Sequence, residues 1–187
     1  MGFPALQHPS GFFFMKSDSS KSDAAPKQLL FVCTGNICRS PMAEVIARAR
    51  LGEKSGWKVA SAGVAAIDGE PASEEAVVAC REIGLDLRQH GSQPVTRELM
   101  ETSRWVVVMT ETHREVLSRR FPEFHARIRT LKSFGFSKDF GDIPDPIGGS
   151  LDVYRTARNQ IESALSDLVI FLLEQDGRIK PGREQKI

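Results

Sequence analysis

One eight-residue segment, residues 33–40 (CTGNICRS), constrains the fold of this 187-residue chain more than any other. The apolar run before it, residues 28–32, predicts a buried strand. Residues 41–47 after it predict a helix, because Pro41 suits a first helical turn and apolar residues recur behind it. The segment therefore has to connect a strand to a helix in a tight loop, with a cysteine at its start and an arginine near its end.

The backbone of this loop is suited to bind a tetrahedral oxyanion. Its amides can converge on one point, at which the following helix also directs the positive end of its dipole. Gly35 permits the dihedral angles of such a nest, and Asn36 tolerates the left-handed region better than most residues. We therefore predict that a phosphate group is bound by the residues that follow the cysteine: Thr34, Gly35, Asn36, Ile37, Cys38, Arg39 and Ser40.

Cys33 is the predicted nucleophile. The loop amides, the helix end and Arg39 all stabilise a thiolate here, and a thiolate beside a bound phosphoryl group can attack phosphorus. Arg39 can hold two phosphoryl oxygens with its planar guanidinium, and Ser40 can donate its hydroxyl to the sulfur. The alternative is a buried structural cysteine, but apolar burial would leave Arg39 unpaired.

A second chemical element, residues 140–149, follows the last predicted strand. Hydrolysis of a phosphate ester needs a proton for the leaving group, which the nucleophile and the arginine cannot supply. Asp145, which precedes a proline in a glycine-containing turn, is the predicted general acid. Asp142 is its rival, and an aspartate that only stabilises the turn is the alternative.

The rest of the chain alternates between predicted strands and helices. Strands are predicted at residues 28–32, 57–62, 105–109 and 128–131, and helices from 41 and at 73–83, 96–101, 110–119 and 150–174. This order predicts a doubly wound, three-layer α/β/α fold with a central four-stranded parallel sheet. Such sheets bind ligands at the carboxyl ends of their strands, where the Cys33 loop lies. Ile83 and Val153 are among the helical side chains predicted to face the core.

The composition argues against several other classes of protein. A net charge of +1 gives no basis for binding nucleic acid or an anionic membrane. Three cysteines, an odd number, do not predict a disulfide framework, so we expect a reducing, cytoplasmic compartment. The spacing of the cysteines and histidines does not predict a zinc site, and no metal or cofactor is expected.

The chain is predicted to hold one domain, residues 28–176. Residues 1–27 are predicted to be a disordered extension, because most of them are polar and many are serine, apart from an apolar group at residues 12–15. Residues 177–187 are predicted to be a flexible tail.

Residues 33–44 (CTGNICRSPMAE) resemble the signature of the low-molecular-weight protein tyrosine phosphatase family, whose bacterial branch also holds protein-arginine phosphatases. Residues 61–64 and 107–110 resemble the ends of the family's next two strands, and residues 145–150 resemble its Asp-Pro acid loop. The resemblance implies a phosphatase I-like (flavodoxin-like) fold and a phosphocysteine intermediate. We expect a phosphorylated protein as substrate, inorganic phosphate as product, and a monomer or weak dimer.

Further roles rest on this resemblance alone. His90 matches a family histidine that hydrogen-bonds Asn36, and Ser61 matches a serine of the same network, which would pre-organise the nest. Cys38 matches a thiol that forms a reversible disulfide with the nucleophile. The alternative for Cys38 is a small buried side chain under the loop.

The other cysteine and histidines carry less information. Cys80 lies on an apolar helix face and is predicted to be part of the core. Thioredoxin-coupled arsenate reductases share the fold but need a further pair of resolving thiols, and Cys80 has no nearby partner. His113 and His125 are predicted to be surface histidines.

The substrate is predicted from two positions. Ile37 matches the tyrosine-specific members, whereas the arginine phosphatases carry threonine there. Ile147, however, stands where tyrosine phosphatases usually have tyrosine, and residues 65–67 supply no aromatic wall. We predict a phosphotyrosine phosphatase, with a protein-arginine phosphatase as the alternative. An arsenate reductase and a non-catalytic phosphate-binding module are weaker alternatives.

Overall fold

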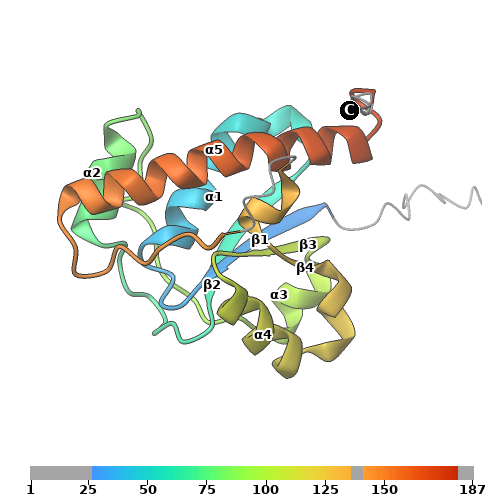
Figure 1. Cartoon of the computed structure of the whole chain (residues 1–187), viewed down its shortest axis with the longest axis horizontal. Coiled ribbons are helices and arrows are strands. Elements are labelled where there is room, and N and C mark those ends of the chain that lie inside the picture. Colours follow the sequence, from blue (N-terminus) through green and yellow to red (C-terminus); the bar gives the residue numbers. More distant parts are fainter. Residues whose placement is uncertain (1–26, 136–140, 181–187) are drawn as a thin grey trace, which may run out of the picture.

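The computed structural model describes residues 27–135 and 141–180 (Figure 1). Its strands are β1 (Gln28–Cys33), β2 (Lys58–Gly63), β3 (Trp105–Val108) and β4 (Ile128–Thr130). They form one sheet in the order β2-β1-β3-β4, and every neighbouring pair is parallel. The predicted four-stranded parallel sheet is confirmed. The chain runs from the central β1 to one edge and then crosses to the other, as in doubly wound folds.

Helices cover both faces of this sheet. The α-helices of the described residues are α1 (Arg39–Leu51), α2 (Glu74–Arg81), α3 (Arg97–Thr102), α4 (Glu111–Arg120) and α5 (Leu151–Gln175). Short 3-10 segments are η1 (Glu53–Ser55), η2 (Pro122–Arg127) and η3 (Leu131–Phe134). Helices α1, α2 and α5 lie on one side of the sheet, and α3 and α4 lie on the other (Figure 1).

Strand β1 is buried on both faces, which positions the loop that follows it. Leu29 and Phe31 belong to the core cluster that includes side chains of α1, α2 and α5. Leu30 and Val32 belong to the cluster on the opposite face, with side chains of β3, α3 and α4. Because successive strand residues point to opposite faces, a strand covered on both sides reads as a continuous apolar run.

Two side chains predicted to face the core are exposed, so those predictions were wrong. Val153 is 44% exposed because Tyr154, one residue further around α5, takes the buried position. The buried side chains of α5 continue from Tyr154 at helical spacing through Ala157, Ile161 and Leu165. Ile83 is 37% exposed because α2 ends at Arg81, so the helical period no longer applies to it.

The structure describes only part of the segments that flank the predicted domain. Residues 1–26 and 181–187 lie outside the described residues, so the predicted extension and tail stay predictions. Within the described part of the chain, no helix combines the length and the hydropathy that crossing a membrane requires.

Candidate active site

The loop between β1 and α1 is the segment predicted to form the anion-binding nest. Asn36 has a φ of 57° and is the one non-glycine residue with positive φ in the described chain. The end of β2 approaches the loop so closely that a Cβ at Gly63 would lie 2.4 Å from the Thr34 carbonyl oxygen. Val64 N donates to the Cys33 carbonyl at 2.9 Å. Gly63 therefore supports the nest by lacking a side chain, whereas sequence reasoning identified it only as the end of a strand.

Hydrogen bonds orient donors onto the Cys33 sulfur. The Asn36 side-chain amide donates to Ser40 Oγ at 2.9 Å and to Ser61 Oγ at 2.8 Å. Because Ser40 Oγ accepts the bond from Asn36, the hydroxyl proton of Ser40 is free to be donated to another acceptor. Cys33 Sγ, at 2.9 Å, is nearer to Ser40 Oγ than the Ala62 carbonyl oxygen, at 3.4 Å. The backbone N–H of Asn36 also donates to Cys33 Sγ at 3.3 Å. Two donors thus stabilise negative charge on the sulfur.

A second layer of contacts holds Asn36 itself. Its side-chain oxygen accepts from Gln93 N at 2.9 Å, and its backbone carbonyl lies 2.7 Å from His90 Nε2. Ser61 donates to a Glu44 carboxylate oxygen at 2.5 Å, which leaves the Ser61 lone pairs to accept from Asn36. The contacts of His90 and Ser61 with Asn36 are those that the family resemblance implied. Glu44 was missed, because its carboxylate lies on a helix face that reads as solvent-exposed.

Arg39 extends from the first residue of α1 into the same loop. It is 3% exposed, and its NH1 donates to the Ile143 carbonyl at 3.1 Å. Its NH2 forms an ion pair with the Asp145 carboxylate and lies 3.5 Å from Thr34 Oγ1. Its Nε is buried without a hydrogen-bond partner among the described residues. A buried guanidinium needs acceptors on all its donors, so Nε is available for an anionic ligand.

The predicted nucleophile, arginine and acid meet in one cavity of about 180 Å³. Its lining residues are Cys33, Thr34, Gly35, Ile37, Cys38, Arg39, Asp145 and Ile147. The Asp145 side chain is 39% exposed at the mouth of this cavity. The rival Asp142 instead accepts from Glu111 N at 2.8 Å, at the N-terminus of α4. The structure therefore brings Asp145, and not Asp142, to Arg39 and into the cavity that Cys33 lines.

Comparison with known proteins agrees with this geometry. The sequence model of the family "Low molecular weight phosphotyrosine protein phosphatase" matches residues 28–178. The chain belongs to this family. A protein-arginine-phosphatase of Geobacillus stearothermophilus is 40% identical over 143 residues, which cover 76% of this chain and 94% of that protein. A probable low molecular weight protein-tyrosine-phosphatase, EpsP of Ralstonia nicotianae, is 34% identical over 136 residues, 73% of this chain and 89% of that protein.

A solved structure of the family is similar over nearly its whole length. The YwlE arginine phosphatase, as a Cys-to-Ser mutant with a phosphorylated active-site serine, superposes with a TM-score of 0.74 at 38% identity. The match covers 81% of this chain and 98% of that protein. The predicted phosphatase fold is thus confirmed, and the chain is a hydrolase of the low molecular weight phosphatase family.

His113 lies beside this phosphatase cavity, so its prediction as a surface residue was wrong. It is 5% exposed, in the first turn of α4. Its Nε2 lies 3.0 Å from Thr34 Oγ1, and its Nδ1 lies 2.8 Å from Thr110 Oγ1. Burial, followed by the charge of Arg39, lowers the pKa of His113 to about 4. His125, by contrast, is exposed as predicted.

Cys38 lies under the loop of this phosphatase, in a polar setting. Its Sγ lies 3.3 Å from the Tyr154 hydroxyl and 3.4 Å from Ser73 Oγ. Burial raises the pKa of the Cys38 thiol, and it raises that of Tyr154 to about 12. Cys80 is fully buried in the core, where burial raises its pKa to about 12. The predicted core position of Cys80 is confirmed, and all three cysteines are free thiols.

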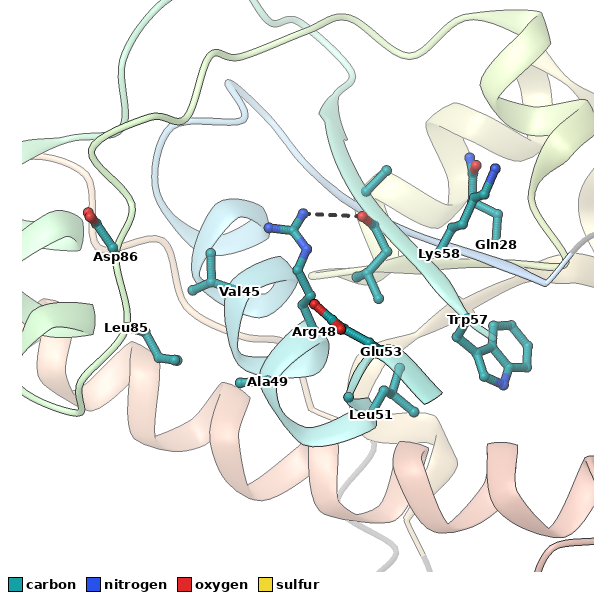
Figure 2. Close-up of a pocket in the computed structure, with 13 residues that line it drawn as sticks. Gln28, Val45, Arg48, Ala49, Leu51, Glu53, Trp57, Lys58, Leu85 and Asp86 are labelled. Carbon is teal, nitrogen blue, oxygen red and sulfur yellow. Dashed lines mark hydrogen bonds between the residues drawn. The ribbon is translucent and has the colours of Figure 1, made fainter. Parts of the chain in front are cut away.

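A larger hollow, of about 810 Å³, lies elsewhere on this phosphatase, beside the edge strand β2 (Figure 2). Arg48 on α1 donates to the Val59 carbonyl of β2 at 3.3 Å, and Leu51 and Trp57 form part of the wall. Its lining includes no cysteine, histidine or serine, so it offers no thiol, imidazole or serine hydroxyl for catalysis. In the described part of the chain, no three His, Cys, Asp or Glu side chains are grouped as metal ligands.

Proposed function

We propose that this chain is a metal-independent protein tyrosine phosphatase that works through a phosphocysteine at Cys33. The observation that carries the proposal is the cavity in which Cys33, the Arg39 guanidinium and the Asp145 carboxylate meet at the head of the amide nest. A sulfur nucleophile, a guanidinium that can bind two phosphoryl oxygens and a carboxyl group that can transfer a proton are the three groups that this route to phosphomonoester hydrolysis requires.

In the first step, the Cys33 thiolate attacks phosphorus, so that a sulfur–phosphorus bond forms and the bond to the tyrosine oxygen breaks. The loop amides and Arg39 hold the three non-bridging oxygens as charge spreads over them. A bound phosphoryl group competes with Asp145 for Arg39 NH2, which frees the carboxyl group to protonate the leaving oxygen.

In the second step, water attacks the phosphocysteine and Asp145 takes its proton. The phosphorus–sulfur bond breaks, inorganic phosphate leaves, and the Cys33 thiolate is restored. Ser40 and the Asn36 backbone N–H stabilise that leaving thiolate through the bonds that they make to Sγ. The phosphorylated serine of the YwlE mutant supports a covalent intermediate at this position.

The phosphotyrosine assignment rests on the walls of the cavity. Ile37 lines it with aliphatic surface, against which an aromatic ring can pack. The guanidinium of phosphoarginine would bring several N–H donors to the same walls. Each donor left without an acceptor costs roughly 1–3 kcal/mol, and Ile37 offers none.

A protein-arginine phosphatase is the second candidate. The 40% identity to the Geobacillus stearothermophilus protein-arginine-phosphatase favours it, as does the aliphatic Ile147 in place of an aromatic wall. Asp145 could accept from a guanidinium at the cavity mouth. For either substrate we propose a cytoplasmic enzyme that acts as a monomer or weak dimer on phosphorylated proteins.

The substrate test compares kcat/KM on two peptides of one sequence that carry phosphotyrosine or phosphoarginine. We expect the wild type to prefer phosphotyrosine by about tenfold or more, which corresponds to one unpaired donor. Ile37→Thr should lower the ratio of the two kcat/KM values, because the hydroxyl of the introduced threonine can accept a hydrogen bond from a guanidinium. Ile170→Thr, at a 39% exposed position of α5, is the matched control and should leave it unchanged. A wild type that prefers phosphoarginine would favour the second candidate.

Asp145→Asn tests the general acid. The amide cannot give up a proton, so we expect kcat on phosphotyrosine peptides to fall by about 10²–10⁴-fold. Activated aryl phosphates, whose leaving groups need no proton, should lose far less. The ratio of the two losses is the measurement, and Asp152→Asn, at an exposed position of α5, is the control. Equal losses on both substrates would remove Asp145 from the role of acid.

A further inference from the structure

A buried histidine outside the predicted set of site residues contacts the active-site loop. The two ring nitrogens of His113 bridge Thr34 Oγ1 and Thr110 Oγ1, at 3.0 and 2.8 Å. Thr110 also accepts from the backbone N–H of His113 at 3.2 Å, as the N-cap of α4. The ring is therefore anchored to a helix terminus on one side and reaches the cavity wall on the other.

Thr34 joins this histidine to Arg39. Thr34 lines the cavity, and its Oγ1 lies within 3.5 Å of Arg39 NH2. Arg39 has few other protein partners: NH1 donates to Ile143 O, and NH2 pairs with Asp145. Among the described residues, those contacts and Thr34 are what hold the guanidinium in place.

During the proposed reaction, Asp145 is only a temporary partner of Arg39. Asp145 must turn to the leaving oxygen in the first step and to water in the second, so it cannot also hold Arg39. Ile143 O and Thr34 Oγ1 then remain as the protein acceptors for the guanidinium. A threonine side chain at an exposed loop position can occupy more than one rotamer, and the contact with His113 Nε2 selects the rotamer that places Oγ1 near Arg39.

We propose that His113 is a positioning residue: through Thr34 it keeps the Arg39 guanidinium aligned on the phosphoryl group while Asp145 is engaged in proton transfer. This inference rests on the proposed function, since it assigns Arg39 to the phosphoryl oxygens. The ring acts as a neutral hydrogen-bonding group. Burial and the charge of Arg39 favour that state, while the carboxylates of Asp145 and Asp142 oppose them more weakly.

Two amide substitutions separate the two contacts of the ring. Glutamine places its terminal amide at about the depth of Nε2, and asparagine at about the depth of Nδ1. His113→Gln therefore keeps a partner for Thr34, whereas His113→Asn keeps one for Thr110 only. We expect kcat/KM on a phosphotyrosine peptide to fall about tenfold in His113→Asn, as for one lost hydrogen bond to a charged site, and much less in His113→Gln. The loss should appear in both kcat and KM, because the same guanidinium holds the phosphoryl group in the ground state and in the transition state.

Thr34→Val shows whether the effect passes through Thr34. It removes the hydroxyl at nearly constant volume and should match the loss in His113→Asn. The double variant should lose no more than Thr34→Val alone, because both changes break one path. His125→Asn, at an exposed position, is the control for the substitution itself. Multiplicative losses in the double variant, or equal losses in His113→Gln and His113→Asn, would overturn the proposal.

Binding of inorganic phosphate, measured by calorimetry on the same variants, separates this inference from the proposed function. Phosphate should bind more weakly to His113→Asn than to His113→Gln, whatever reaction the site performs. A wild type without phosphatase activity that still shows this difference would contradict the proposed function and keep the positioning role. Equal phosphate affinity in both variants would contradict the positioning role. Thermal unfolding of each variant identifies any loss that comes from the fold.

Discussion

Replacing Cys33 by serine lowers kcat on a phosphotyrosine peptide by about 10⁴-fold or more, because a hydroxyl is a far weaker nucleophile than a thiolate. The affinity for inorganic phosphate stays close to that of the wild type, since the loop amides and Arg39 do not depend on the sulfur. A quenched-flow assay gives kcat, and calorimetry gives the dissociation constant for phosphate.

Cys33→Ala is the matched variant for this experiment. After incubation with substrate, intact mass spectrometry should find one phosphate on Cys33→Ser, formed slowly on the introduced hydroxyl, and none on Cys33→Ala. This difference locates the covalent intermediate at position 33. A Cys33→Ser protein that retains more than a tenth of the wild-type kcat would exclude Cys33 as the nucleophile.

Replacing Arg39 by lysine lowers kcat/KM on the same peptide by about 10³-fold, which is the scale for losing a main transition-state donor. Lysine keeps the charge but loses the planar fork that can bind two oxygens at once. It also leaves the Ile143 carbonyl without its guanidinium partner. The affinity for inorganic phosphate should fall by a smaller factor than kcat/KM, because the fork acts most strongly on the transition state.

Arg119→Lys is the control for this substitution, since its side chain is 75% exposed on α4. Thermal unfolding should show that Arg39→Lys remains folded at the assay temperature. A loss of less than tenfold in kcat/KM would mean that a point charge suffices, and that the amide nest does most of the work on the phosphoryl oxygens.

The order of strands and helices could be predicted because each is a local property. The apolar run of β1 indicates a strand buried on both faces, Pro41 marks a first helical turn, and the recurring apolar residues of α5 follow a period of 3.6 residues. The two wrong burial predictions have local causes of the same kind. Val153 lies about 100° around α5 from Tyr154, and Ile83 lies beyond the end of α2.

The active-site loop was also visible in the sequence. Its nest, its nucleophile and its arginine are neighbours along the chain, so their spacing carries the chemistry. Asp145 was harder to choose, because Asp142 lies only three residues before it in the same loop and carries the same carboxyl group. Their contacts in the folded structure distinguish the two aspartates. Asp142 accepts a hydrogen bond from the backbone N–H at the N-terminus of α4, whereas Asp145 forms an ion pair with Arg39.

The sequence by itself therefore determined a strand–loop–helix unit in a parallel α/β sheet, and it predicted phosphate binding at the loop of that unit. Only the tertiary structure decided which distant side chains support it. Thr34 and His113 are 79 residues apart, and Glu44 and Ser61 are 17 apart. His113 looked solvent-exposed because charged residues surround it in α4, yet the helix rotation buries it against the loop. A local period predicts which face of a helix is apolar, but a polar side chain is buried only where another element supplies its hydrogen-bond partners.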